Sequence, residues 1–214
     1  MVFSIDLGRY RVVDLSWQVV PPGTADRPFV VQRGRLADNA YKFDVIRTHT
    51  HVGTHVESPA HFFPKGKDVT GLPLEAFFGR AVLLDVRDAS QAAAIGGEYL
   101  GKHVGGLIQA GDIVICRNSD PEAKAHPCFT PEAALWLRDR GIKMLGIGTD
   151  LGLGATITAG RAFHDILMSR DICLVEFLDN LAELRRREFF FMALPFKCGQ
   201  IDSSPARAIA IEQR

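Results

Sequence analysis

Several ligand-type side chains are concentrated in one short segment. The chain has seven histidines, and four of them lie between His49 and His61. The spacing His-x3-His-x-Glu-x3-His joins His51, His55, Glu57 and His61. Imidazole nitrogens and carboxylate oxygens are ligands that Zn²⁺, Mn²⁺ and Fe²⁺ accept. The segment therefore predicts a divalent-metal site, with His49 in a supporting or merely exposed position.

The local backbone can bring these side chains together. In an extended chain alternate side chains share a face, so His55 and Glu57 are expected to point the same way. His51 and His61 have the same parity. Gly53 permits a bend or a close backbone approach within the segment. We therefore expect a compact, curved segment that directs its ligand-type side chains toward a common point.

The elements that must position this segment are mainly strands. Short apolar runs predict buried strands at 81–86, 112–116 and 143–148, and further strands are expected at 11–16, 41–50, 171–176, 189–196 and 206–211. A helix is predicted from the N-cap Thr130, followed by Pro131, to Gly141. A second helix is expected over 160–169. This pattern indicates an α/β fold with a mixed β-sheet and a few covering helices, not a regular βαβ repeat.

The histidine segment resembles the signature of the cyclase family of metal-dependent hydrolases. That family includes bacterial kynurenine formamidases and isatin hydrolases. Similar elements recur over most of the chain, at 146–150, 163–167, 174–181, 193–197 and 204–208. The resemblance implies a single domain over residues 1–214 with the swivelling β/β/α fold of that family. It also implies a homodimer or a higher homo-oligomer.

The resemblance implies a metal ligand set as well. His51 and His55 would bind one ion, and Glu57 could bridge to a second. His164 would bind the second ion, and Glu176 could touch both. Spacing alone permits the convergence of His164 and Glu176 without demanding it. The implied cofactor is Zn²⁺ or Mn²⁺, with one or two ions per chain.

His61 is implied as the acid/base of a hydrolytic reaction. A bound divalent metal lowers the pKa of its water from about 15.7 toward about 7. An imidazole with a pKa near 6.5 can take up that proton and pass it to a leaving group. The expected substrate is a small molecule with an amide, lactam, lactone or ester bond. Its identity and its binding residues are unknown from the sequence, and a ligand role for His61 stays open.

Two positions depart from the family pattern. The family has aspartate where this chain has Glu57, which keeps the charge but moves the carboxylate. Kynurenine formamidases also carry a Trp-Pro-Gly-Asp-type stretch whose tryptophan lines the substrate pocket. The corresponding residues 24–28 here are Thr-Ala-Asp-Arg-Pro, and Trp17 cannot be equated with that tryptophan. Formylkynurenine is therefore a weaker expectation than hydrolysis itself.

Composition excludes other classes of protein. Basic and acidic residues number 25 each, which argues against nucleic acid or an anionic membrane as the main partner. The sequence has no signal-peptide pattern and no long apolar run, so a cytoplasmic location is expected. No Gly-x-Ser-x-Gly elbow is present, so nucleophilic serine catalysis is poorly supported.

Two alternatives to a metal-dependent hydrolase remain. They are a non-haem iron redox enzyme and a catalytically impaired metal-binding protein of the same fold.

Overall fold

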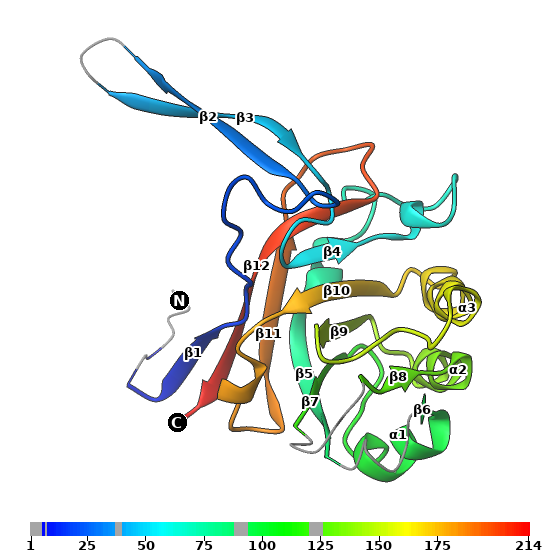
Figure 1. Ribbon diagram of the computed structural model, residues 1–214. Helices are drawn as coiled ribbons and strands as arrows, with labels where there is room; N and C mark the ends of the chain where they lie inside the picture. The colour runs from blue at the N-terminus through cyan, green and yellow to red at the C-terminus, as the bar shows by residue number, and fades with distance from the viewer. Residues whose placement is uncertain (1–5, 7, 37–39, 88–93, 120–125) are drawn as a thin grey trace.

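A mixed sheet of eight strands forms the body of the protein. The computed structural model describes residues 6, 8–36, 40–87, 94–119 and 126–214 (Figure 1). The strands follow the order β1-β12-β11-β5-β7-β9-β10-β4. Their bounds are β1 (Tyr10–Asp14), β4 (His55–Glu57), β5 (Phe78–Val86), β7 (Ile113–Asn118), β9 (Met144–Gly148), β10 (Cys173–Leu178), β11 (Glu188–Pro195) and β12 (Ser203–Gln213). Because β4 also pairs with β12, the sheet closes into a barrel.

The central strands are buried on both faces. Strands β5, β7, β9 and β10 run parallel, and the other pairings of the sheet are antiparallel. Along β5, Ala81 and Leu83 belong to a core cluster that collects residues from all eight strands. Val82 and Leu84 belong to a second core cluster, which contains helix residues. This double burial explains why these strands are nearly continuous apolar runs in the sequence.

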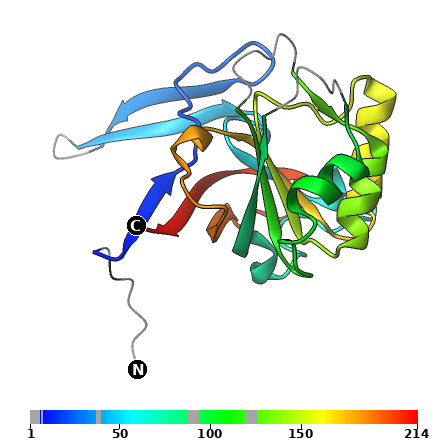
Figure 2. The ribbon, with the colours of Figure 1, turned by 90° about the horizontal axis from the view of Figure 1, so that it is seen from below.

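Within the described residues, three α-helices are present, and they lie along one side of the sheet (Figures 1 and 2). They are α1 (Gly97–Val104), α2 (Pro131–Asp139) and α3 (Ile157–Met168). Leu100, Leu137 and Phe163 place all three helices in the core cluster that includes Val82 and Leu84. The shorter elements are β6 (Ala94–Ile95), β8 (Cys128–Phe129) and the 3-10 turns η2 (Pro59–His61), η3 (Leu74–Phe77) and η4 (Leu181–Glu183). No helix within the described ranges is long and apolar enough to cross a membrane.

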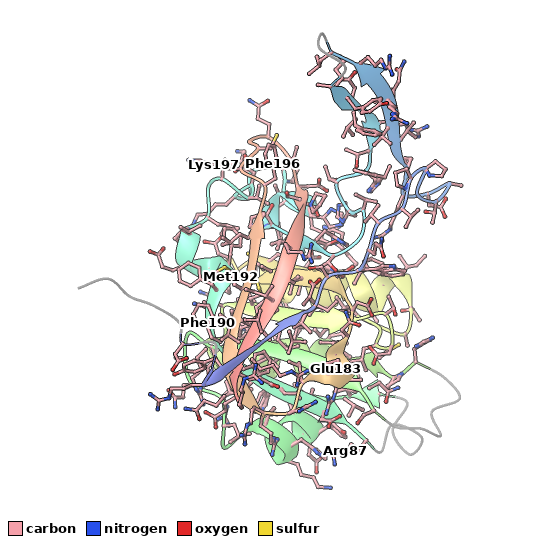
Figure 3. All side chains as sticks on the ribbon, turned by 90° about the vertical axis from the view of Figure 1, so that its left-hand side faces the viewer. Arg87, Glu183, Phe190, Met192, Phe196 and Lys197 are labelled. Atoms are coloured by element: carbon pink, nitrogen blue, oxygen red, sulfur yellow. The ribbon has the colours of Figure 1, made fainter. Side chains whose placement is uncertain are left out.

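A β-hairpin projects from this body. It consists of β2 (Phe29–Arg35) and β3 (Tyr41–Thr48), and every residue of β3 is exposed. Figure 3 shows the hairpin extending away from the barrel, with side chains on both of its faces. A two-stranded hairpin is at best marginally stable by itself in water. The hairpin therefore lacks the packing that stabilises the rest of the fold.

The expected elements are largely present, with differences that have local causes. The strands predicted at 81–86, 112–116, 143–148, 171–176 and 189–196 are confirmed within a few residues. Helix α3 begins at Ile157, earlier than predicted, because the Thr156 hydroxyl caps it by accepting the Ala159 N–H. Helix α1 and strand β2 were not predicted. Gly97 and Gly101 lower the helix propensity of α1, which removes its sequence signal.

The strands beside the barrel interior approach closely at Gly146. A Cβ atom added there would lie 2.5 Å from Ile115 Cδ1, 2.8 Å from Val175 Cγ1 and 2.9 Å from Leu178 Cδ1. Because these side chains are buried, we expect Gly146→Ala to lower the free energy of unfolding by about 1–3 kcal/mol. Urea unfolding followed by circular dichroism measures the change. Gly106→Ala is the control, since nothing lies within 4 Å of that position. Equal stability of both variants would contradict this packing.

Candidate functional site

Strand β4 places two of the predicted ligands on one face. It lies between β10 and β12, with His55 opposite Glu176 of β10 and Pro205 of β12. Val56 is completely buried in the core cluster of the barrel. Because side chains alternate along a strand, His55 and Glu57 point to the other side. The predicted common face of these two residues is confirmed.

Tight turns on both sides of β4 bring in two more histidines. Gly53 has φ +61°, and a Cβ atom there would lie 2.3 Å from Val19 Cγ2, so the turn before β4 requires glycine. This turn places His51 Nδ1 2.7 Å from Glu57 Oε1. After β4, η2 turns the chain back, and His61 Nε2 lies 3.9 Å from Glu57 Oε1.

His164 and Glu176, the two predicted ligands outside the histidine segment, also reach this centre. Glu176 precedes Phe177, which has φ +55°, and the pairing of β10 with β9 shifts register at this point. Such a bulge redirects side chains at the end of a strand. His164 Nε2, from α3, lies 3.6 Å from Glu57 Oε2 and 3.8 Å from Glu176 Oε1. All six predicted residues are therefore brought together around Glu57.

The ligand-type atoms form two overlapping groups. His51, Glu57 and His61 form one group, and His55, Glu57 and Glu176 form the other, with atoms within 4.8 Å of one another in each. His61 is therefore close enough to act either as a ligand or as an acid/base. His49 is exposed, and its Nδ1 accepts a hydrogen bond from the His51 backbone N–H at 3.0 Å. Its position fits a supporting role for the turn.

Two of the histidines are anchored by backbone carbonyls. His55 Nδ1 donates to the Gly53 oxygen at 2.8 Å, and His164 Nδ1 donates to the Gly160 oxygen at 2.7 Å. A carbonyl oxygen can only accept, so the hydrogen of each neutral ring is on Nδ1. This leaves Nε2 of both rings as the atom available to a ligand. In both cases Nε2 is the atom nearest to the Glu57 carboxylate.

The sequence interpretation missed Asp202. Its Oδ2 atom lies 2.7 Å from His61 Nδ1 and 2.9 Å from His51 Nε2. Asp202 lies two residues before the C-terminal element that begins at Ser204. This position was the only feature of the sequence that could have pointed to it. One acid among 25 does not stand out in the sequence. Its closeness to the histidines depends on the start of β12 lying beside β4.

Two acids of the centre, Glu57 and Asp202, are held in their charged form. Burial raises the pKa of Glu57, but hydrogen bonding to His51 and the nearby imidazoles outweigh it, so this pKa lies well below its usual range. Burial also raises the pKa of Asp202, yet the hydrogen bonds from His51 and His61 lower it to about 2. Burial lowers the pKa of His51 and His164, and their carboxylate partners raise it above the ordinary value.

Two buried atoms of the centre lack a partner. His55 Nε2 and Glu57 Oε2 are shielded from solvent, and neither has a hydrogen bond to any residue that the structure describes. The side chains are 0% and 4% exposed. Buried polar atoms without a partner are rare in folded proteins because they lose their hydration without replacement. A group that contacts both a ring nitrogen and a carboxylate oxygen would give both atoms a partner.

An apolar pocket adjoins this centre. A cavity of about 320 Å³ is lined by Trp17, Val52 and Phe177, among others. The Phe177 ring lies 5.4 Å from the His55 ring between centroids. The Arg27 guanidinium lies 4.3 Å from the Phe177 ring centroid and donates to the His51 carbonyl oxygen at 2.7 Å. The pocket and the histidine centre therefore share Phe177 as a common wall.

The aromatic residues after the motif have different environments. The Phe62 ring lies 4.3 Å from the His61 ring and 4.9 Å from the His164 ring between centroids. Phe62 and Phe63 are both partly buried and pack against the core cluster of the helices. Phe62 therefore contacts two histidines of the site directly.

Comparisons with known proteins identify the family of this chain. The family model described as putative cyclase matches residues 13–151. A kynurenine formamidase from Bordetella petrii is 28% identical, over 92% of this chain and 97% of its own length. Isatin hydrolase A from Labrenzia aggregata, solved with benzyl benzoate, has a TM-score of 0.79 at 25% identity, covering 97% of this chain and 96% of its own. A predicted metal-dependent hydrolase from Bacillus stearothermophilus shares the fold, with a TM-score of 0.74 at 22% identity. The match covers 94% of this chain and 98% of the other. The chain therefore belongs to the putative cyclase family, and it is a hydrolytic enzyme.

Proposed function

We propose that this hydrolase depends on a divalent metal and cleaves an amide-type bond in a small molecule, with His61 as the acid/base. The observation that carries this proposal is the pair of unpartnered buried atoms, His55 Nε2 and Glu57 Oε2. A ring nitrogen and a carboxylate oxygen that both lack a hydrogen bond are suited to a common cation. The surrounding donors, all nitrogen and oxygen, fit Zn²⁺ or Mn²⁺.

Five residues would hold the metal: His51, His55, Glu57, His164 and Glu176. Glu57 belongs to both groups of candidate ligands, so we propose that it bridges two ions where two are bound. Its carboxylate lies within 4 Å of a ring nitrogen from each of these three histidines. The glutamate that replaces the family's aspartate therefore has sufficient reach, and we propose that metal binding is retained.

His61 would move the proton of the reaction. When bound, a divalent ion supplies a Lewis acid that makes water acidic near neutral pH and polarises a carbonyl group. His61 is 27% exposed, more than the other histidines of the centre, so it can exchange protons with solvent. Its Nε2 faces Glu57 and would take the proton of the attacking water. The same atom would then protonate the leaving group.

The pocket supports a substrate with an apolar or aromatic part. Trp17 and Phe177 line it, with ring centroids 5.6 Å apart. Relatives named kynurenine formamidase and isatin hydrolase favour an amide-type bond. Trp17 comes from a segment upstream of residues 24–28, where the aromatic residue of kynurenine formamidases is missing. We therefore propose an aromatic amide or lactam without committing to formylkynurenine.

The two alternatives that the sequence left open are less favoured than a hydrolase. Relatives named as hydrolytic enzymes give no support to an iron redox enzyme or to an inactive binding protein. A cytoplasmic location stays a prediction.

Metal binding should stabilise the protein. Adding Zn²⁺ or Mn²⁺ to chelator-treated protein is expected to raise the melting temperature, because a ligand at 100 times its Kd contributes about 2.7 kcal/mol. Glu57→Gln removes the negative charge that both groups of candidate ligands share. This variant should therefore lose most of the rise in melting temperature. Differential scanning calorimetry with and without metal measures both effects. A melting temperature that neither ion raises in the unaltered chain would contradict a metal site.

Replacing His61 should separate catalysis from metal binding. We expect His61→Ala to retain the metal content of the parent chain and to lose about 10²- to 10⁴-fold in kcat, the usual range for a lost acid/base. Elemental analysis and turnover of a panel of aryl formamides and lactams test this. His126→Ala, at an exposed position outside the centre, is the matched control. Loss of metal from His61→Ala would instead make His61 a ligand.

We propose that the β2–β3 hairpin packs on a second copy of the chain, which accounts for the implied homodimer. Tyr41, Phe43 and Val45 share one face of β3, and all three are more than half exposed. Lys42 and Asp44 occupy the other face and pair with each other at 3.0 Å. An exposed apolar stripe on a hairpin that lacks further packing favours burial against another molecule.

A charge on the apolar face should weaken this association. Phe43→Glu is expected to shift the sedimentation profile from dimer toward monomer, because a buried carboxylate without a partner is costly. Gln32→Glu adds the same charge beside Asp44, on the polar face, and should leave the profile unchanged. A monomeric parent chain, or equal effects of the two variants, would contradict the proposal.

A further inference from the structure

Asp202 has a fixed place between two parts of the site. Its backbone oxygen accepts hydrogen bonds from the Ser58 N–H at 2.9 Å and from the Ser58 hydroxyl at 2.8 Å. Ser58 immediately precedes the η2 turn that carries His61. Asp202 itself immediately precedes β12, which pairs with β4. The position of its carboxylate is therefore set by the main chain on both sides.

One oxygen atom of this carboxylate contacts two imidazole rings. Asp202 Oδ2 lies 2.9 Å from His51 Nε2 and 2.7 Å from His61 Nδ1, and the two ring centroids are 4.5 Å apart. A charged carboxylate only accepts hydrogen bonds, so both of these ring nitrogens carry a hydrogen. The opposite nitrogen of each ring then faces Glu57, Nδ1 in His51 and Nε2 in His61.

The other two histidines of the centre are anchored in a different way. His55 and His164 are each anchored by a carbonyl of their own segment, from Gly53 and Gly160. Among the hydrogen bonds of the described residues, none joins a backbone carbonyl to the ring of His51 or His61. Asp202 supplies the anchor for both.

We infer that Asp202 is the positioning residue that orients His51 and His61 together, the first as a metal ligand and the second as the acid/base. The inference rests on the proposed function of these two histidines. A carboxylate that accepts from the second nitrogen of a ligand histidine fixes the ring and its tautomer. Here the same oxygen would do so for the group that moves the proton, so one side chain links metal binding to proton transfer.

Removing this carboxylate should affect both steps. For Asp202→Ala we expect kcat to fall about 10- to 100-fold with little change in KM, and zinc affinity to fall by a similar factor. Asp202→Asn keeps one accepting oxygen and should recover part of both losses. Steady-state kinetics and zinc titration calorimetry measure these quantities on the zinc-loaded and zinc-free full-length chain.

The ring spectra provide a readout that a general loss of stability does not produce. Long-range ¹H–¹⁵N correlation spectra of the zinc-loaded chain distinguish the two imidazole tautomers. The His61 signals are assigned by their loss in His61→Ala. We expect a single tautomer with hydrogen on Nδ1 in the parent chain and a mixture in Asp202→Ala. Thr50→Val is the matched control, because the Thr50 hydroxyl donates only to the other oxygen, Oδ1, at 3.1 Å.

Two results would overturn the inference. The first is an Asp202→Ala chain that keeps the parent tautomer of His61 and the parent kcat. The second is an equal loss of kcat in Asp202→Ala and Thr50→Val with an unchanged His61 tautomer, which would mark a merely structural contact. An inactive parent chain would contradict the proposed function instead, and the ring spectra would still decide the placement of His61 by Asp202.

Discussion

The buried carboxylate of Glu57 imposes the main constraint on this protein. A charge removed from water needs close partners of opposite charge or hydrogen-bond donors. Imidazoles from β4, from the turns on either side of it and from α3 approach this carboxylate. Each ring is held on its far side by a carbonyl or by Asp202. One carboxylate oxygen nevertheless stays without a hydrogen bond in the described structure, and we propose that a cation is the partner that completes the site.

Closure of the barrel creates the place where these groups meet. Strand β4 has only three residues, and it joins β10 on one side to β12 on the other. This seam brings Glu57, Glu176 and Asp202 together from distant parts of the chain. Because Val56 faces the barrel interior, its neighbours on β4 must face outward, toward α3. The centre therefore lies on the outer side of the barrel wall, beside the pocket that contains Trp17 and Phe177.

The structural features that depend on local sequence patterns could be predicted. Apolar runs indicated the central strands, and the spacing of the histidine motif indicated the shared face of His55 and Glu57. His164 and Glu176 required the family resemblance, because their spacing alone did not demand convergence. The barrel closure and Asp202 were missed, since both depend on pairing between strands far apart in the sequence. Helix α1, with two glycines, and β2, on the exposed hairpin, lacked a clear local pattern.

Anomalous X-ray scattering from crystals grown with Zn²⁺ or Mn²⁺ can show whether a metal ion lies beside His55 and Glu57. Data collected on both sides of the absorption edge of the metal locate the ion independently of any assumption about its ligands. We expect an anomalous peak within coordination distance of His55 Nε2 and Glu57 Oε2. A metal-loaded crystal with no peak there, or with its only peak elsewhere on the molecule, would rule out a metal site at these residues.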